Sequence, residues 1–574
     1  MPKVTIDGKE IEVEPGTTII RAAERLGIFI PRYCYHPALT IAANCRICLV
    51  EVERSPKLLT ACSTPVAEGM VVHTNSERVR DAREGIMEFL LINHPLDCPI
   101  CDQAGECKLQ DYTFTYGAPV SRFTERKVRS KKRAFSEHIW FDPNRCIKCT
   151  LCIRFCKEIA GADELTLINR GNQTEIATFS DGPVTNPYSC NIVDICPVGA
   201  LTLRDFRFVE RVWDIIQVDS VCPGCSKGCN TILGVKGQRI LRVKPRHNPH
   251  VNDYWICDYG RFYYDWMNDE NRLKAPLIRR EAQLAPLAHV LPGITGEVSI
   301  APRRERELLP ASWKEAIDFI AESIRRIVEN YGPEAVAGIG STHLTNEDLF
   351  MFVKLLKVVI GTPHVAFRPP DGRAPGLELK EDQLLLERDK SPNYEGALDM
   401  GLKPDYQGIL EGIREGRIRA LYIAGSDLVR KVPGVEQILD NLELLIVQDL
   451  RVTETALNAD AVLPAASYAE KDGTFTNSAG RVQRIRPAFK PVGEARPDWE
   501  VFLLLARRLG GDLGIRELVV KPLEARPSAI RRWNYEPFEY RSAEDVFRAI
   551  SGEVPGYQGM SYENLGGWGM QRVK

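Results

Sequence analysis

Several common features are missing from this sequence of 574 residues. It has no uncharged apolar run of about 18 residues or more, and its start, MPKVTIDGKEIEVEPG, lacks the apolar core of a signal peptide. Neither sign of charge predominates, because 75 Lys and Arg residues stand against 77 Asp and Glu residues. We therefore expect a soluble protein without a membrane span, and composition gives no reason to expect binding to nucleic acid.

Familiar catalytic motifs are also missing. The sequence contains no P-loop, no GxGxxG and no defensible Ser-His-Asp arrangement, so we do not expect this protein to bind nucleotides. A basic run, SRFTERKVRSKKR at 121–133, is interpreted as a solvated connector, with contact to a neighbouring subunit as the alternative.

Cysteine is confined to one part of the chain. All 17 cysteines lie between Cys34 and Cys257, and the last 317 residues have none. Disulfide scaffolds are typical of small secreted domains, whereas closely spaced cysteines in a large intracellular chain indicate metal binding. The first half of the chain is therefore predicted to hold metal.

The N-terminal residues predict a small domain. Val4–Val13 alternates around Gly8-Lys9 as a hairpin would, and Thr17 is expected to cap a helix that runs to Leu26 and ends at Gly27. This order is typical of a β-grasp ferredoxin domain.

The first group of cysteines follows in a loop poor in regular structure, with the spacing C-x10-C-x2-C-x13-C. A [2Fe-2S] cluster suits four such thiolates, since each of its two irons needs two terminal sulfur ligands. A four-cysteine zinc site has the same ligand types and remains the alternative. This first set comprises Cys34, Cys45, Cys48 and Cys62.

Two further groups predict [4Fe-4S] clusters. The second set has the spacing H-x3-C-x2-C-x5-C and comprises His94, Cys98, Cys101 and Cys107. A neutral imidazole in place of a thiolate should raise the potential of its cluster. The third set lies in CIKCTLCIRFC, where bacterial ferredoxins bind a cluster through the first three cysteines and a distant Cys-Pro, and comprises Cys146, Cys149, Cys152 and Cys196.

A second ferredoxin cluster is not expected beside the third set. Its remaining cysteines would fall at positions 186, 189 and 192, which are Asn, Ser and Ile. Cys156 and Cys190 are thus left over, and we expect both to be buried without binding iron. His36 lies near a ligand, but no ligand position is open for it, so we interpret it as structural or as a support for the site.

The fourth set reads C-x2-C-x3-C-x27-C and also predicts a [4Fe-4S] cluster. With it, the four sets use 15 of the 17 cysteines. Its members are Cys222, Cys225, Cys229 and Cys257.

The ordered set of these motifs resembles the large iron–sulfur subunit (the G subunit) of NADH:quinone oxidoreductase, respiratory complex I. The resemblance implies an electron-transfer subunit of the peripheral arm, with one [2Fe-2S] and three [4Fe-4S] clusters that pass electrons from the NADH/FMN subunit toward quinone. The first three clusters would lie on the main route and the fourth would lie off it. The protein itself would make no bonds.

The same resemblance implies partners and a location. The partners would be the other peripheral-arm subunits: the FMN/NADH-binding subunit, the small 2Fe-2S subunit, the 8Fe ferredoxin-like subunit and the quinone-module subunits. The protein would lie on the cytoplasmic side of the inner (plasma) membrane as part of a membrane complex.

The cysteine-free part changes character. A Pro- and Arg-rich stretch, Ala275–Pro310, is interpreted as a linker or surface insertion. Ser312 then caps a helix over 313–331, and short apolar runs alternate with helical patterns as in an α/β layered domain. The apolar runs are AVAGIG, RALYIAGSD, LELLIVQDL and DAVLPAAS.

This part resembles the molybdopterin oxidoreductase fold through SWKEAIDFIAE, GEARPDWE and VQDLRVTETALNADAVLPAASYAEKDGTFTNSAGRVQ. Three departures predict a degenerate domain without molybdopterin. No cysteine follows Cys257, the middle around Arg368–Leu398 is shortened, and Tyr259 stands where the family's C-x-K-G has lysine.

The predicted fold class is multidomain α+β and α/β. We expect a β-grasp 2Fe-2S ferredoxin domain, a 4Fe-4S segment with one His and three Cys ligands, a 4Fe-4S ferredoxin-like domain, a 4Fe-4S domain of molybdopterin-oxidoreductase type and a degenerate molybdopterin-oxidoreductase-like domain. Their ranges are 1–78, 79–118, 119–213, 214–270 and 271–574. The alternatives are the catalytic subunit of an NAD-linked formate dehydrogenase with a working pterin site and, less supported, part of an iron-only hydrogenase.

Overall fold

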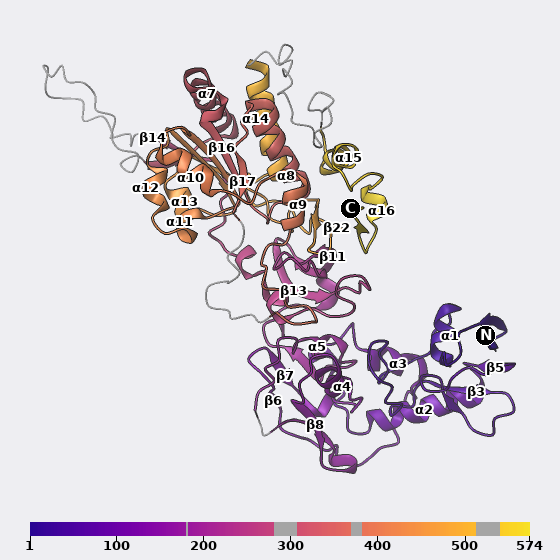
Figure 1. The fold of residues 1–574 in the computed structure, drawn as a ribbon. Helices are drawn as coiled ribbons and strands as arrows, with labels where there is room; N and C mark the ends of the chain where they lie inside the picture. Colours follow the sequence, from indigo (N-terminus) through magenta and orange to yellow (C-terminus); the bar gives the residue numbers. More distant parts are fainter. Residues whose placement is uncertain (180–181, 281–306, 369–380, 513–539, 574) are drawn as a thin grey trace, which may run out of the picture. The chain divides into compact units, whose positions relative to one another are not determined.

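The computed structural model describes residues 1–179, 182–280, 307–368, 381–512 and 540–573, and it divides into two compact units. The first unit comprises Met1–Ile215 and Trp255–Asp258, and the second comprises Ile216–Tyr254 and Tyr259–Lys574. Figure 1 shows the elements of both units, which are described separately below.

The first unit begins with a five-stranded sheet in the order β2-β1-β5-β3-β4, on which α1 (Ile19–Arg25) packs through buried Ile and Ala side chains. β1 pairs antiparallel with β2 and parallel with β5, which confirms the predicted ferredoxin-like start. The strands are β1 (Lys3–Ile6), β2 (Lys9–Glu12), β3 (Leu49–Val52), β4 (Leu59–Thr60) and β5 (Met70–His73).

Two local predictions were displaced by one residue. The hairpin turns at Asp7-Gly8, whose φ angles are 45° and 81°, rather than at Gly8-Lys9. The residue before α1 is Thr18, not Thr17, because the carbonyl of Thr17 accepts a hydrogen bond from the amide of Val66 and so remains in extended pairing. Adjacent threonines give no local signal that separates the two positions.

The rest of the first unit consists of short elements. A three-stranded sheet has the order β10-β7-β6, and β8 pairs with β9. The helices are α2 (Glu77–Leu91), α3 (Lys108–Tyr116), α4 (Leu151–Glu158) and α5 (Asn191–Ile195), and the strands are β6 (Arg133–Ala134), β7 (Ile139–Phe141), β8 (Leu165–Ile168), β9 (Glu175–Thr178) and β10 (Leu201–Leu203).

The second unit starts with an antiparallel meander of β11, β12 and β13. A seven-stranded sheet follows in the order β15-β14-β20-β19-β18-β16-β17, in which β16 to β20 are parallel. The strands are β11 (Ile216–Val221), β12 (Asn230–Lys236), β13 (Arg239–Pro245), β14 (Leu277–Arg280), β15 (Glu307–Pro310), β16 (Val336–Gly340), β17 (Val365–Phe367), β18 (Ala420–Ala424), β19 (Leu444–Asp449) and β20 (Ala461–Pro464).

The four apolar runs form β16, β18, β19 and β20, as predicted. The linker prediction for Ala275–Pro310 was wrong at both of its ends, because β14 pairs antiparallel with β15 and with β20. Ile278 is 3% exposed against this sheet, but the arginines that follow it mask the short apolar signal. The middle of the stretch, 281–306, lies outside the described residues, as does 369–380 of the predicted shortened region.

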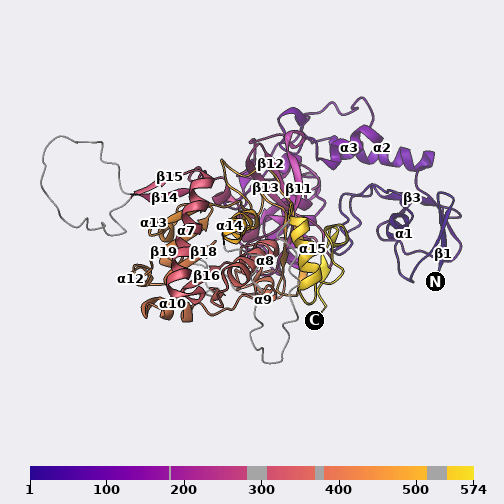
Figure 2. The same ribbon diagram turned by 90° about the horizontal axis from the view of Figure 1, so that it is seen from above.

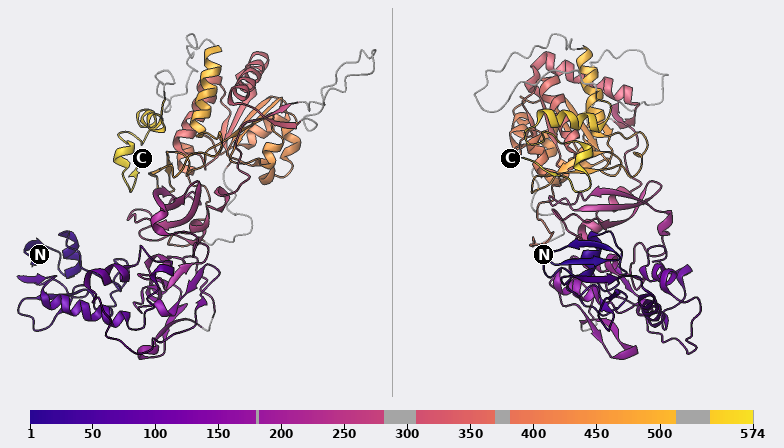
Figure 3. Two further views of the ribbon diagram at one scale, coloured as in Figure 1. Left: turned by 180° about the vertical axis from the view of Figure 1, so that it is seen from behind. Right: turned by 90° about the vertical axis from the view of Figure 1, so that its right-hand side faces the viewer.

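Helices cover both faces of the large sheet (Figures 1 and 2). Tyr422 faces the apolar layer that contains α7, α8 and α14, whereas Leu421 and Ile423 face the layer that contains α10 and α12. Figure 3 shows α7 and α14 side by side. These helices are α7 (Trp313–Tyr331), α8 (Asn346–Val353), α10 (Gln407–Arg414), α12 (Val435–Leu439) and α14 (Asp498–Asp512).

Smaller elements complete the second unit, and β21, β22 and β23 form one further sheet. They are α6 (Asp258–Phe262), α9 (Tyr394–Asp399), α11 (Leu428–Lys431), α13 (Glu454–Leu457), α15 (Ala543–Glu553), α16 (Tyr562–Leu565), β21 (Gly473–Thr476), β22 (Arg481–Ile485) and β23 (Met570–Gln571). Over the described ranges, no helix is both long enough and apolar enough to cross a membrane.

Candidate iron–sulfur sites

The first set of cysteines forms two thiol pairs. The neighbouring thiol of Cys45 lowers the pKa of Cys34, and that of Cys62 lowers the pKa of Cys48. Two pairs of thiols match the two irons of a [2Fe-2S] cluster, each of which takes two terminal sulfur ligands, so the donor set fits that group.

The third set of cysteines lines one small enclosed cavity. Cys146, Cys149 and Cys152 come from the loop and first turn of α4, and Cys196 comes from the end of α5. Apolar side chains form most of the remaining wall, and burial raises the pKa of the Cys146 thiol to about 12. Four sulfurs in a pocket lined by Phe141, Ile147, Leu151, Ile176, Val198, Ala200 and Leu201 fit a [4Fe-4S] cluster.

The backbone of this loop is shaped for its cysteines. Lys148 and Thr150 have φ angles of 56° and 64°, in the left-handed region that side chains other than glycine seldom adopt. The amide of Lys148 donates to the sulfur of Cys146 over 3.4 Å. Left-handed residues between the cysteines therefore turn the chain so that successive thiols reach the same cavity.

The second set lies between α2 and α3. Cys98 starts a 3₁₀ turn, Cys101 is 8% exposed, and Cys107 precedes α3. His94 is half-buried in the loop after α2, where burial lowers the pKa of its imidazole to about 4. A neutral imidazole is the form that ligates metals. His94 and Cys101 also share two charged neighbours, Asp97 and Arg145.

The third set lies next to the second. The amide of Lys108, which follows Cys107, donates to the carbonyl of Pro197 over 3.0 Å. A Cβ atom added to Gly199 would lie 2.5 Å from the sulfur of Cys101, so only glycine fits at this position. The loops of the two sets are therefore in direct contact.

The third set also contacts the first. Arg154 of α4 donates to the carbonyl of Cys34 over 2.6 Å and to that of Cys149 over 3.3 Å. Asn44 donates to the carbonyl of Lys148 over 3.3 Å. The third set thus contacts both the first set and the second.

Three members of the fourth set lie in the second unit, where Cys222 and Cys229 flank the turn from β11 to β12 and the amide of Cys222 donates to the carbonyl of Cys229. Cys225, between them, is buried. Cys257 belongs to the first unit, in the segment Trp255–Asp258. The four cysteines of this set are therefore divided between the two units, and their grouping is predicted from the sequence alone.

Tyr259 lies close to this turn. Its ring is 3.1 Å from the position that a Cβ atom of Gly224 would occupy, and the ammonium of Lys390 lies 4.8 Å from the ring centroid. A lysine from another segment, Lys390, thus stands beside Tyr259, where the resemblance predicts a lysine.

The two cysteines outside the sets are buried, with Cys156 1% and Cys190 0% exposed. The amide of Asn186 lies 3.9 Å from the sulfur of Cys156, and Asp258 accepts hydrogen bonds from Ser189 and from the amide of Cys190. Hydrogen-bonded polar side chains therefore occupy the region where a second ferredoxin cluster would need cysteines.

The ring of His36 stacks on that of Trp255 at 5.0 Å, and its Nδ1 atom accepts a hydrogen bond from the amide of Ala38. None of the 17 cysteines, all within the described ranges, forms a disulfide. In the same ranges, no three His, Cys, Asp or Glu side chains are arranged as a single metal ion would require.

Sequence reasoning missed the arginines beside the sites. Arg145 directly precedes Cys146 and is 3% exposed, and Arg154 lies inside CIRFC. Their position next to predicted ligand cysteines was the available signal, but their contacts with residues 97 and 34 join segments far apart in the sequence.

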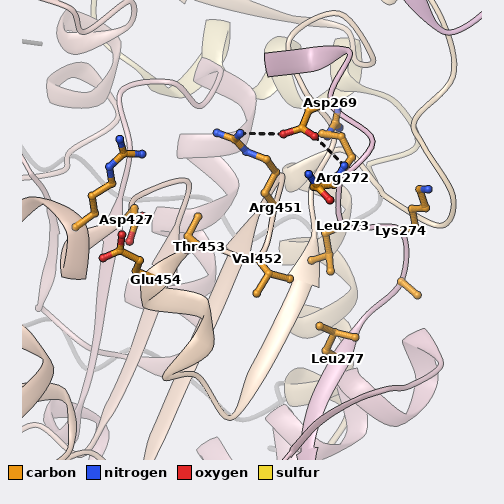
Figure 4. Close-up of a pocket in the computed structure, with 13 residues that line it drawn as sticks. Asp269, Arg272, Leu273, Lys274, Leu277, Asp427, Arg451, Val452, Thr453 and Glu454 are labelled. Atoms are coloured by element: carbon orange, nitrogen blue, oxygen red, sulfur yellow. Dashed lines mark hydrogen bonds and ion pairs between the residues drawn. The ribbon is translucent and has the colours of Figure 1, made fainter. Parts of the chain in front are cut away.

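An open pocket of about 740 Å³ lies in the second unit at the carboxyl ends of β18 and β19 (Figure 4). Charges of both signs line it, and several are paired within the protein. Arg451 pairs with Asp269 at 3.2 Å, buried Arg272 pairs with Glu470 at 2.6 Å, and Asp427 accepts from Thr455.

Known families match most of the chain. A 2Fe-2S iron–sulfur cluster binding domain matches residues 2–77, and the NADH-ubiquinone oxidoreductase-G iron–sulfur binding region matches 83–122. The ferredoxin-like domain of NADH-quinone oxidoreductase subunit 3 matches 136–202. The molybdopterin oxidoreductase Fe4S4 domain matches 216–269, and molybdopterin oxidoreductase matches 272–378 and 389–508. The protein thus contains a 2Fe-2S domain and 4Fe-4S binding domains.

Individual proteins are similar over nearly the whole length. The G subunit of the NADH-quinone oxidoreductase of Rickettsia felis is 32% identical over 90% of this chain and 89% of its own length. A G subunit of the Rhizobium meliloti enzyme, designated G 2, is 29% identical over 99% of this chain and 83% of its own. A crystal structure of NAD⁺-reducing [NiFe]-hydrogenase in the H₂-reduced state is 29% identical, with a TM-score of 0.34, over 37% of this chain and 91% of that chain. The protein belongs to the family of NADH-quinone oxidoreductase G subunits.

Proposed function

We propose that this protein is an electron-transfer subunit in the peripheral arm of an NADH-quinone oxidoreductase and that it conducts electrons from an NADH- and FMN-binding subunit toward quinone. Family membership supports this role. The observation that carries it is the continuous contact between the first, third and second sets of predicted ligands.

Sixteen side chains would hold the clusters. When bound, each cluster supplies a centre that gains and loses one electron. The first set would hold a [2Fe-2S] cluster and the other three sets [4Fe-4S] clusters: Cys34, Cys45, Cys48 and Cys62; His94, Cys98, Cys101 and Cys107; Cys146, Cys149, Cys152 and Cys196; Cys222, Cys225, Cys229 and Cys257.

The protein around these ligands would fix their neighbours and exclude water. Arg154 and Asn44 hold the first loop against the third, and the contact at Gly199 holds the third against the second. Buried Phe141, Leu151 and their neighbours keep the third cavity apolar. A fixed, dry arrangement of this kind favours transfer between neighbouring sites and sets their potentials.

The same proposal includes a location and partners. The protein would bind the FMN/NADH-binding subunit, the small 2Fe-2S subunit, the 8Fe ferredoxin-like subunit and quinone-module subunits on the cytoplasmic side of the inner membrane. Reconstitution of the assembled enzyme with and without this protein, followed by NADH-to-quinone activity, tests this part.

Metal analysis tests the ligand sets directly. Anaerobically purified protein should contain about 14 iron atoms and no zinc. Stoichiometric zinc would contradict the assignment of the first set, and a deficit of about four irons with intact Cys222–Cys257 would contradict that of the fourth.

His94 gives a sharper test of the second set. His94→Cys should keep a four-iron cluster and lower its potential, because a thiolate adds negative charge and disfavours reduction. His94→Ala should weaken or open the site. If His94→Ala changed neither the potential of that cluster nor the NADH-to-quinone rate of the assembled enzyme, the fourth ligand would lie elsewhere.

We also propose that residues 271–574 serve as a structural domain without molybdopterin. The absence of cysteine after Cys257 and the tyrosine at position 259 support this role. Elemental analysis that found stoichiometric molybdenum or tungsten would instead favour a working pterin site, as in an NAD-linked formate dehydrogenase.

A further inference from the structure

Arg145 is a buried cation between the second and third sets of ligands. It ends the 3₁₀ turn Pro143–Arg145 and directly precedes Cys146. Its side chain is only 3% exposed, although an arginine is seldom buried without charged partners. Its burial therefore requires charged partners nearby.

The guanidinium of Arg145 is held by two carboxylates. Its Nη2 atom donates to Asp97 over 2.8 Å, and its Nε atom lies 3.6 Å from Asp142, which is itself 2% exposed. Asp97 immediately precedes Cys98, so the first contact joins the loop of the second set to the loop of the third. Lys132 adds a second cation on Asp142 at 3.0 Å.

The stem of Arg145 also packs at the contact between the two sets. Its Cδ atom lies 3.6 Å from the position of a Cβ atom on Gly199, and the sulfur of Cys101 lies 2.5 Å from that same position. The arginine thus lies beside a ligand sulfur of the second set, and its charge acts on both Cys101 and His94.

We propose that Arg145 is a positioning residue for electron transfer between the second and third clusters, an inference that rests on the function proposed above. It fixes the Asp97–Cys101 loop against the third set, and its buried positive charge makes the second cluster easier to reduce. A cluster becomes more negative when it is reduced, and a nearby fixed cation stabilises that state most in a buried, weakly screened place.

Arg154 provides an internal comparison. It bridges the first and third sets as Arg145 bridges the second and third, and its charge acts on Cys34. No charge interaction with Arg154 is among the principal influences on Cys101 or His94. The two arginines should therefore act on different clusters.

The test is a redox titration of the full-length protein, purified anaerobically and followed by EPR, together with its iron content. Arg145→Met keeps the apolar stem and should lower the midpoint potential of the second cluster, because Asp97 loses its cation and Asp142 keeps only Lys132. Arg145→Lys should restore most of that potential. Asp97→Asn, which removes a negative charge, should raise it. Arg154→Met should leave the potential of the second cluster unchanged.

These outcomes separate charge from packing. Wild-type iron content and an unchanged second potential in Arg145→Met would overturn the inference. If Arg145→Met lost iron, Asp97→Asn would decide, and a wild-type potential of the second cluster in that variant would overturn the inference. A wild-type protein that bound no iron at the second set would refute the proposed function and this inference with it. Retained iron with shifts of opposite sign in Arg145→Met and Asp97→Asn would support the charge role.

Discussion

The strands of the first unit are two to four residues long, whereas the parallel sheet of the second unit is covered by helices of up to 19 residues. The first unit contains 14 of the cysteines, the second unit contains three, and the sheet itself contains none. Both faces of the sheet bury extensive apolar layers.

This difference indicates two sources of stability. Around the second and third sets, short elements and loops surround buried and half-buried thiols, and metal binding would contribute folding energy there. In the sheet domain, defined as the part of the second unit built on the seven-stranded sheet, apolar burial dominates. Loss of a cluster should therefore disorder the first unit and spare the sheet domain.

The largest expected effect comes from removing a ligand of the third set. Cys149→Ser should cost about four irons, because serine is a poor ligand for such a cluster. It should also loosen the loops that contact this set. Iron analysis combined with region-resolved hydrogen exchange would show increased exchange around residues 146–200 and unchanged exchange in β16 to β20.

Cys156→Ser is the matched control, since Cys156 lies on α4, directly after the loop that holds Cys149, and is also buried. It should leave the iron content unchanged, as should a change of Cys190. Loss of about four irons from Cys156→Ser would mean that this cysteine is a ligand after all.

In the sheet domain, the largest effect should come from a buried charge. Lys471 is 4% exposed and donates to Asp348 and to Asp498, each over 2.6 Å. Lys471→Met would leave both carboxylates buried without their cation and should cost about 3–5 kcal/mol in the free energy of unfolding. Urea unfolding of the sheet domain within the full-length protein measures this cost.

The exposed pair of Lys314 with Asp318 is the control, because Lys314→Met should change the free energy of unfolding by at most about 1 kcal/mol. Burial raises the pKa of Asp498 to about 6 even with Lys471 present. The cost of Lys471→Met should therefore be smaller at acidic pH, where Asp498 is protonated, and a pH-independent cost would argue against this explanation.

A smaller, pH-dependent effect is expected at Glu347. Burial raises the pKa of this carboxyl from 4.5 to about 8. Between these values the folded protein retains a proton that the unfolded protein releases, so stability should fall as pH rises from 4.5 to about 8. Glu347→Gln should abolish this dependence of stability on pH and stabilise the sheet domain at pH 8 relative to wild type. Thermal unfolding measured across this pH range would show both effects. An unchanged slope would indicate that Glu347 ionises normally.

The smallest effect concerns the start of α7. Ser312 accepts from the amide of Glu315 while the Glu315 carboxylate accepts from Ser312, which forms a capping box. Ser312→Ala should cost about 1 kcal/mol of unfolding free energy in the sheet domain, with no change in iron content. A loss of iron would show that the two regions are coupled more strongly than proposed.

Much of the fold could be predicted because its signals are local. Ser312 before an amphipathic run predicted α7, and uninterrupted apolar runs predicted the buried strands that form β18 and β19. Strands β14 and β15 were missed because each is only four residues long and charged residues interrupt the pattern. Their pairing with the sheet is a long-range contact.

The sequence by itself determined the groups of possible ligands, because cysteine spacing reflects how a short loop can surround a metal centre. It also determined where the cysteine-rich part ends. Only the tertiary structure decided that the third set contacts both the first and the second, and that Arg145 is buried beside Cys101. Contacts between residues such as Arg154 and Cys34, 120 positions apart, leave no local periodicity or spacing from which they could be inferred.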